Sequence, residues 1–462
     1  MARVALIGEN SKEYVDTLID IWNNGDCAVL LDWRIPVSSM LAMMTDANVH
    51  QCFIEQSLFN KYQNENLGKI KFITYKATSN AAEKLPDYIY AKFQPSYCND
   101  EAVIIYSSGT TGNAKGIILS HFAINTNADA IIDYMKPNKD ECLYVVKPLS
   151  HSSSITGELL VALKTHMALV LSPTIVPPRY VFNTINKFGV STICVNPTLL
   201  TMYSDAALMS NTQLFSLTKI YVSGSILKKQ TLDKCRNTFK NIAIYNVYGL
   251  SEAGPRVAAQ HANVQNENSV GSAISGVEIK IVDEDGQSVP IEEIGLIHIK
   301  TPSIFAGYVS GNKSLTSKLE GWHNTGDIGY FDNRNELHIV DRADDVIIIG
   351  AHKIYPTQIE QSIMEVSDIQ ECTVVTANNA TGKEILCCIY VSTNDVQTDI
   401  KNHLNKYFIK YEIPQLFIKV ERIPKTSNGK TSRKQISAII TQILNDNTSN
   451  NYAYLFNLQT HK

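Results

Sequence analysis

Short runs of aliphatic and β-branched residues alternate with helix-like patterns over the first third of the chain. The apolar runs at 4–7, 28–31 and 70–74 have the length of buried strands, and apolar residues recur at helical spacing over 14–22 and 38–47. Strands that alternate with helices favour a sheet with crossover helices. The sequence therefore predicts an α/β arrangement for this part of the chain.

The pattern changes after residue 270. Short apolar runs at 277–282, 296–299 and 337–340 are separated by Asp, Gly and Asn, which predicts a small β-rich subdomain. A strand at 346–349 opens a further α/β segment that ends in a helix near 432–444. Between them, residues 341–345 hold three carboxylates and an arginine, which is typical of an exposed hinge.

These patterns together predict the fold class and the domains. We expect an α/β protein whose large N-terminal domain, residues 1–341, consists of α/β subdomains and the small β-rich subdomain. A small, mobile α+β C-terminal domain is expected to follow at 342–462.

Composition excludes several classes of protein. The chain has 41 Lys and Arg against 45 Asp and Glu, a net charge of −4 without a long run of one sign, so nucleic acid is not an expected partner. The most apolar stretch, 158–171, is interrupted by Lys164 and His166, and the N-terminus shows no signal peptide. We expect a cytoplasmic protein with no membrane span. Nine cysteines without a CxxC pair, and no HExxH, predict reduced thiols and no zinc site.

A strand at 102–106 leads into the segment Ser107-Ser-Gly-Thr-Thr-Gly-Asn-Ala-Lys-Gly116. Its glycines and hydroxyls can surround a phosphate while the lysine neutralises charge. The Walker pattern needs Gly before the Lys and Ser or Thr after it, but Ala114 and Gly116 stand there. The alternative is a flexible turn between two strands. The candidate phosphate-binding residues are Ser107, Ser108, Gly109, Thr110, Thr111, Gly112 and Lys115.

This segment resembles the ATP-binding signature of the adenylate-forming superfamily, which includes acyl-CoA synthetases, peptide-synthetase adenylation domains and luciferases. Four further segments are similar to that superfamily's motifs, in the same order: Tyr245-Asn-Val-Tyr-Gly-Leu-Ser-Glu-Ala-Gly-Pro255, Gly321-Trp-His-Asn-Thr-Gly-Asp327, Asp341-Arg-Ala-Asp-Asp-Val-Ile-Ile-Ile-Gly350 and Ile423-Pro-Lys-Thr-Ser-Asn-Gly-Lys430. The chain departs from the pattern at Asp341, where Gly is usual, at Ser251, where Thr is more common, and in lacking a further strand and helix before residue 4.

The resemblance implies a nucleotide site. Glu252 is expected to contact Mg²⁺, a hard cation that prefers carboxylate oxygen, and its alternative is a surface carboxylate. Tyr248 would face adenine unless it is a core tyrosine. Asp327 would accept two ribose hydroxyls unless it only forms an Asx-turn, and Arg342 would reach ribose or phosphate unless it forms a hinge salt bridge. Further expected nucleotide contacts are Gly224, Ser225, Gly249 and Ser251.

The resemblance also implies catalytic roles. Lys430 would bridge the acid and the α-phosphate, where negative charge accumulates, and Lys115 would contact the departing phosphates. Asp344 matches the hinge about which the C-terminal domain swings. His151 lies in a segment similar to the Pro-Leu-Phe-His of acyl- and aryl-CoA synthetases, beside the acid, with a helix-start polar residue as the alternative. Since no Asp stands near it to pair with an α-ammonium group, an acid without an α-amino group is favoured.

We therefore expect an AMP-forming acid–thiol ligase, closest in motif to aryl- or acyl-CoA ligases such as 4-coumarate CoA ligases. It would use ATP and Mg²⁺ to activate a carboxylic acid, and coenzyme A or the phosphopantetheine arm of an acyl carrier protein to accept the acyl group. The alternatives are a catalytically degenerate nucleotide- or acyl-binding module, a stand-alone adenylating enzyme that only loads a carrier protein, and a phosphoryl-transfer ATPase that releases ADP.

Overall fold

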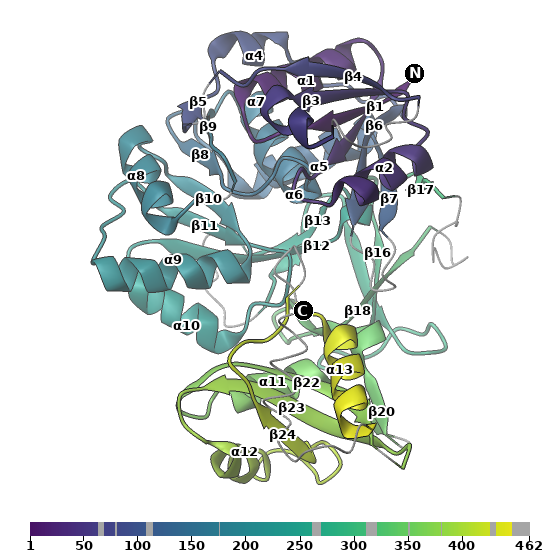
Figure 1. Cartoon of the computed structure of the whole chain (residues 1–462), viewed down its shortest axis with the longest axis vertical. Coiled ribbons are helices and arrows are strands. Elements are labelled where there is room, and N and C mark those ends of the chain that lie inside the picture. Colours follow the sequence, from purple (N-terminus) through teal and green to yellow (C-terminus); the bar gives the residue numbers. More distant parts are fainter. Residues whose placement is uncertain are drawn as a thin grey trace.

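The computed structural model describes residues 1–62, 69–78, 81–107, 114–174, 176–260, 269–310, 321–349, 352–379, 381–425 and 431–445. Two large sheets form the upper part of the molecule in Figure 1, and a three-stranded sheet with its own helices lies at the bottom. A four-stranded antiparallel sheet lies between these two regions. The architecture is of the predicted mixed α/β class.

The first large sheet has the strand order β17-β7-β6-β2-β1-β3-β4. Its strands are β1 (Arg3–Ile7), β2 (Cys27–Leu31), β3 (Gln51–Glu55), β4 (Lys71–Tyr75), β6 (Glu101–Ser107), β7 (Lys115–Ser120) and β17 (Gly307–Tyr308). The strands from β4 to β6 run parallel, whereas β7 and β17 are antiparallel. The parallel strands need crossover helices, and α1 (Lys12–Asn23) and α2 (Val37–Asp46) confirm the two predicted ones.

The second large sheet has the order β14-β13-β12-β11-β10-β8-β9-β5. Its strands are β5 (Glu83–Lys84), β8 (Cys142–Val145), β9 (Ala168–Leu171), β10 (Thr192–Val195), β11 (Lys219–Val222), β12 (Ala243–Gly249), β13 (Arg256–Ala259) and β14 (Ser272–Ala273). The run from β9 to β12 is parallel, so the carboxyl ends of β10, β11 and β12 lie at one edge. Ligands of parallel sheets bind at such edges.

Helices cover both sheets and also fill the space between them. Apolar side chains of both sheets, such as Leu6 and Leu169, form one buried core with the helices between the sheets. These are α1, α4 (Asp87–Lys92), α5 (His121–Met135), the π-helix η2 (Ile155–Leu160) and α7 (Val161–Thr165). A second core joins the other face of the second sheet to α8 (Pro178–Phe188), α9 (Pro197–Ser210) and α10 (Lys229–Thr238). A third joins the outer face of the first sheet to α2, α3 (Gln56–Phe59) and η1 (Asn60–Tyr62). Each fully buried aliphatic side chain stabilises the folded state by about 1.5–3 kcal/mol relative to an exposed one.

The predicted β-rich region forms a four-stranded antiparallel sheet of β15 (Glu278–Val282), β16 (Gly295–Lys300), β18 (His323–Phe331) and β19 (Leu337–Arg342). The region is not wholly contained in that sheet, because β17 leaves it and pairs with β7 of the first sheet, Gly307 opposite Ile118. An edge strand offers unpaired backbone groups that such a segment can satisfy. This crossover carries Tyr308 to the start of β7.

The last part of the chain has two apolar cores of its own, on opposite faces of a three-stranded sheet. The sheet consists of β22 (Ile369–Asn378), β23 (Glu384–Ser392) and β24 (Leu416–Lys419), and it follows the hairpin of β20 (Ile347–Ile349) and β21 (His352–Ile354). One face packs against α11 (Pro356–Ile363) and α12 (Gln397–Leu404), and the other against α13 (Arg433–Asn445). The predicted strand near 346–349 and the final helix are confirmed.

In the part of the chain that the structure describes, no helix is both long and apolar enough to cross a membrane.

The buried imidazole of His323 makes stability depend on pH. Burial lowers the pKa of His323 from its ordinary value of 6.5 to about 4. Below pH 6.5 the unfolded chain binds a proton that the folded chain does not, so the free energy of unfolding decreases as the pH falls toward 4. Urea unfolding measures the free energy of unfolding of the unmodified protein and of His323→Gln at pH 6.5 and at pH 4.5. We expect the decrease between these two pH values to be about 2 kcal/mol smaller in His323→Gln. The exposed His50 supplies the control His50→Gln, and an equal pH dependence in all three proteins would contradict the prediction.

Candidate active site

The predicted phosphate loop connects two paired strands. In the β6–β7 hairpin Ser107 lies opposite Lys115, so the ends of the loop are held side by side. Ser108, Gly109, Thr110, Thr111 and Gly112 lie outside the described residues. The Lys115 ammonium lies 5.6 Å from the centre of the Tyr308 ring, within reach of a cation–π attraction.

Glu252 lies in the 3₁₀ turn η3 (Ser251–Ala253), directly after β12. The hydroxyl of Tyr308 donates a hydrogen bond to Glu252 Oε1 at 2.9 Å, and the amide of Phe305 donates to the Glu252 carbonyl at 2.8 Å. Tyr308 of β17 therefore holds the carboxylate of Glu252, and the segment just before β17 holds its backbone. Tyr308 lies between Lys115 and Glu252 and contacts both. The structure thus brings together two predicted site residues that lie far apart in the sequence.

Sequence reasoning did not identify Tyr308. It lies outside the five motifs, and 56 residues separate it from Glu252. Only the pairing of β17 with β7 shows its place, and the sequence around it has no alternation that would predict such a short strand.

A second group of predicted residues meets at Asp327, whose side chain is buried. Asp327 Oδ2 accepts a hydrogen bond from the Tyr248 hydroxyl at 2.5 Å, and Oδ1 accepts one from Arg342 Nη1 at 2.9 Å. Burial, with the charge of Asp327, raises the pKa of Tyr248 well above its usual range, so the phenol stays protonated and donates. A carboxylate has about four acceptor positions. A carboxylate in this position can accept hydrogen bonds from several groups at once, as ribose binding would require.

The ring of Tyr248 is 9% exposed and packs in the core of the β-rich region. Its hydroxyl is fixed by Asp327, as expected of the core tyrosine that was its alternative role. Contact with adenine would use the small exposed part of the ring and remains a prediction. The neighbouring Gly249 has a steric role, because a Cβ there would lie 2.1 Å from the carbonyl oxygen of Pro255.

The loops after the parallel strands hold other predicted contacts. Gly224 and Ser225 are exposed in the loop after β11, and Gly224 has a φ of +103°, which favours glycine. Ser251 follows β12, and its hydroxyl is 2.9 Å from that of Ser152. These loops lie at the sheet edge where ligands bind in parallel sheets.

His151 is the N-cap residue of α6 (Ser152–Ser154), and its side chain forms no capping hydrogen bond. Its Nε2 atom is 4.0 Å from Asp32 Oδ2. Asn10 fixes the preceding segment, since its amide donates to the Lys147 carbonyl at 2.8 Å and its oxygen accepts from the Leu149 amide at 2.9 Å. The contact between Ser152 and Ser251 then ties the His151 segment to the turn that carries Glu252.

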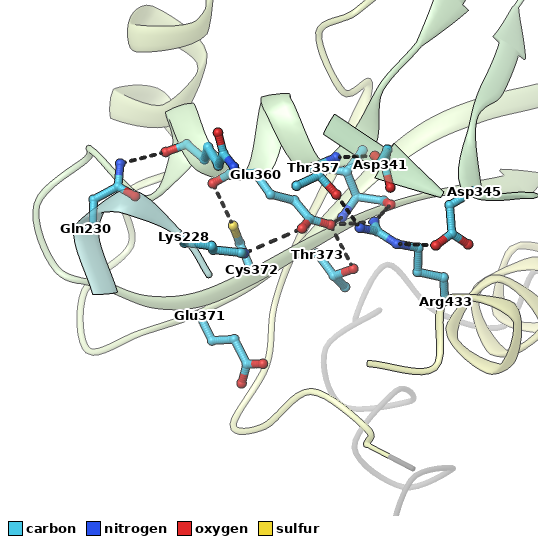
Figure 2. A network of polar contacts seen from close by, with 12 residues as sticks. Lys228, Gln230, Asp341, Asp345, Thr357, Glu360, Glu371, Cys372, Thr373 and Arg433 are labelled. Atoms are coloured by element: carbon cyan, nitrogen blue, oxygen red, sulfur yellow. Dashed lines mark hydrogen bonds and ion pairs between the residues drawn. The ribbon is translucent and has the colours of Figure 1, made fainter. Parts of the chain in front are cut away.

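The expected hinge contacts the last part of the chain through its carboxylates. Asp341 Oδ2 accepts from the amide of Thr357 at 2.9 Å. Arg433 binds Glu360 Oε1 at 2.5 Å and lies 3.7 Å from Asp345 Oδ2. Figure 2 shows Arg433 between these two carboxylates. Asp344 lies exposed in the turn η4 (Ala343–Asp345).

Two contacts connect α11 to the start of α10. Lys228 Nζ lies 3.4 Å from Glu360 Oε2, on the side opposite Arg433 in Figure 2, and Gln230 donates to the carbonyl of Gln361 at 3.0 Å. Burial alone would raise the pKa of Glu360, but the charges of Arg433 and Lys228 hold it below its usual value. The ionised Glu360 is thus shared between the two parts of the molecule.

Lys430 lies outside the described residues. The flanking residues Lys425 and Thr431 form an antiparallel bridge.

Comparison with known proteins agrees with this architecture. The family model described as AMP-binding enzyme matches residues 1–309, and that of the AMP-binding enzyme C-terminal domain matches residues 358–430. A 4-coumarate–CoA ligase of Pinus taeda is 28% identical over 73% of this chain and 65% of its own length. A 2-succinylbenzoate–CoA ligase of Bacillus mycoides is 26% identical over 96% of this chain and 89% of its own. The solved structure of o-succinylbenzoate CoA synthetase from Bacillus subtilis, in complex with ATP and magnesium ion, has a TM-score of 0.79 at 23% identity, covering 94% of this chain and 89% of that one.

The fold and the two family matches thus define the two-part architecture of one enzyme family. The chain belongs to the AMP-binding enzyme family, the adenylate-forming superfamily. It spans less than two thirds of the length of the Pinus taeda relative.

The contact between Tyr308 and Glu252 yields a prediction. We expect Tyr308→Phe to raise the Mg²⁺ concentration needed for half-maximal ATP binding by about tenfold, because a hydrogen bond to a charged group is lost. Calorimetric titration with ATP at several Mg²⁺ concentrations measures this. The control is Tyr97→Phe, which removes an exposed hydrogen bond to Asp129. If both variants require the same Mg²⁺ concentration as the unmodified protein, Tyr308 does not position Glu252 for the ion.

Proposed function

We propose that the protein is an AMP-forming carboxylate–thiol ligase. The observation that carries this proposal is the meeting of two groups of side chains around one sheet edge. Lys115 and the Tyr308-bound Glu252 suit the phosphates of a nucleotide, and Asp327 with Arg342 suits its ribose. Family membership supports the same conclusion.

Glu252 is the proposed protein contact of Mg²⁺. Among the described residues, no three His, Cys, Asp or Glu side chains come together as a metal site. A single fixed carboxylate fits an ion that keeps waters and phosphate oxygens as its other ligands. When bound, the ion would neutralise charge on the phosphates, and Lys115 would add a further positive charge there.

The reaction would proceed in two steps. An oxygen of the acid attacks the α-phosphorus of ATP, and the bond to pyrophosphate breaks, which gives acyl-AMP. Lys430 would stabilise the negative charge of this first transition state. A thiol then attacks the acyl carbon, the bond to AMP breaks, and the thiol proton passes to solvent. AMP leaves readily where a carboxylate oxygen would not.

The names of the relatives support a proposal for the acid and for the thiol acceptor. The printed names of the two relatives specify CoA ligases of 4-coumarate and 2-succinylbenzoate, which supports an aryl or acyl acid and coenzyme A as acceptor. His151 is the proposed neighbour of the acid. A carrier-protein thiol is the second candidate acceptor.

Asp344 is the proposed hinge between the two steps. Rotation of the C-terminal part about the exposed η4 turn would separate Glu360 from Lys228, while Glu360 and Arg433 would move together. The contact with Lys228 would therefore stabilise only one of the two arrangements.

Acid-dependent exchange of labelled pyrophosphate into ATP tests the proposed function. An active ligase shows exchange that depends on the acid added, and a degenerate binding module shows none with any acid. An ATPase that transfers the terminal phosphoryl group would release ADP instead.

The variant Lys430→Ala separates the two steps. We expect it to lose about 10²–10³ in the rate of exchange, as for other lost charge-stabilising donors, yet to form thioester from supplied acyl-AMP at the normal rate. Rapid-quench measurement of both half-reactions checks this. Equal losses in the two half-reactions would show that Lys430 is not specific to adenylation.

A further inference from the structure

Three charged side chains lie buried together outside the groups described above. Lys147 follows β8, Glu158 lies in the π-helix η2, and Arg256 begins β13, with exposed fractions of 8%, 0% and 3%. Lys147 Nζ is 3.3 Å from Glu158 Oε1. The cluster has two cations and one carboxylate, so it carries an excess of positive charge in the protein interior.

The cluster also has unused hydrogen-bonding capacity. Among the described residues, no hydrogen-bond partner satisfies Arg256 Nε, Glu158 Oε2 or the hydroxyl of Thr156, whereas Glu158 Oε1 is held by the ion pair with Lys147. Burial raises the pKa of Glu158, with the charge of Lys147 acting against it. Buried polar groups are almost always paired, so a group of unpaired ones indicates that something polar binds there.

The cluster adjoins the candidate active site. Arg256 lies four residues after Glu252, and Asn127 fixes its backbone, accepting from the Arg256 amide and donating to its carbonyl, both at 2.9 Å. Gly157 brings the backbone of η2 next to the guanidinium, since a Cβ there would lie 3.5 Å from Arg256 Nη2. The π-helix also follows directly after the short helix that His151 begins, and such helices occur often at functional sites.

We propose that the acid substrate carries a second carboxylate at its far end, and that Arg256 binds this group. The inference rests on the proposed function, because it names the acid that the ligase would activate. A guanidinium binds a carboxylate through two parallel hydrogen bonds, and Arg256 Nε is available for one of them. Lys147 and Glu158 are positioning residues, which hold the guanidinium in a site of net positive charge.

A second arginine near His151 is a poorer candidate. A cavity of about 410 Å³ is lined by Trp33, Arg34 and six other residues, but Arg34 already binds Asp32 through both Nε and Nη2. Its charge is therefore neutralised within the protein. No acidic side chain is paired in this way with Arg256 among the described residues.

The test compares acids that differ only in the second carboxylate. Each linear monocarboxylate is paired with the dicarboxylate of equal carbon number, and benzoate with the three benzenedicarboxylates. We expect the best dicarboxylate to support pyrophosphate exchange with a kcat/KM at least tenfold above that of its monocarboxylate partner. Arg256→Met should abolish this preference, Arg256→Lys should retain part of it, and Glu158→Gln should increase it. The ratio between paired acids is unaffected by a general loss of activity.

Two matched controls locate the effect. Arg34→Met tests the cavity, and Arg334→Met removes an exposed arginine on the β-rich region; both should keep the preference for dicarboxylates. The inference is wrong if monocarboxylates are used equally well, if Arg256→Met keeps the preference, or if Arg34→Met loses it.

A binding measurement keeps this result separate from the proposed function. Calorimetric titration with the paired acids, in the presence of Mg²⁺ and a non-hydrolysable ATP analogue, reports recognition without turnover. Absence of exchange with every acid would contradict the ligase function alone. Dicarboxylate binding that weakens at least tenfold in Arg256→Met would still support the inference, and equal binding of paired acids would overturn it.

Discussion

The arrangement of the candidate site depends on the two hydrogen bonds that the buried carboxylate of Asp327 accepts. It accepts from Tyr248 at the end of β12 and from Arg342 at the end of β19. These strands belong to different sheets, so one side chain fixes the second large sheet against the β-rich sheet. Removing a buried charge partner leaves the other groups uncompensated, which costs several kcal/mol. The same residue that would bind ribose therefore also holds the β-rich sheet in place.

The strand β17 fixes the second group of proposed site residues, Lys115 and Glu252. Because β17 pairs with β7, the chain that connects β16 to β18 passes the first large sheet, and Tyr308 reaches both Lys115 and Glu252. Backbone pairing at a sheet edge thus holds Lys115, the lysine proposed to bind phosphate, and Glu252, the carboxylate proposed to bind Mg²⁺, on either side of Tyr308. Both groups of proposed site residues are therefore held by side chains that come from the β-rich region, Tyr308 in one group and Asp327 in the other.

Much of the fold could be predicted because it depends on local patterns. The apolar runs that became β1, β2, β4 and β19 are short and bounded by turn residues. The strands β1 and β2 are buried as expected, whereas β4 lies at the edge of the sheet and is partly exposed. The five motifs could be recognised for a related reason, since each is contiguous in the sequence. By contrast, Tyr308, Lys228 and Arg256 act through partners more than fifty residues away or through unpaired atoms. Their surroundings exist only after the sheets have paired, so no sequence period could reveal them.

The proposed function requires that the acid attack the α-phosphorus of ATP. The direct measurement is to supply an acid labelled with ¹⁸O in its carboxylate, together with ATP, Mg²⁺ and coenzyme A, and to analyse the nucleotide product by mass spectrometry. We expect AMP that contains one ¹⁸O atom, because the oxygen that attacks phosphorus stays on AMP when the thiol displaces it. Unlabelled AMP, or ADP in its place, would show that the acid does not attack the α-phosphorus.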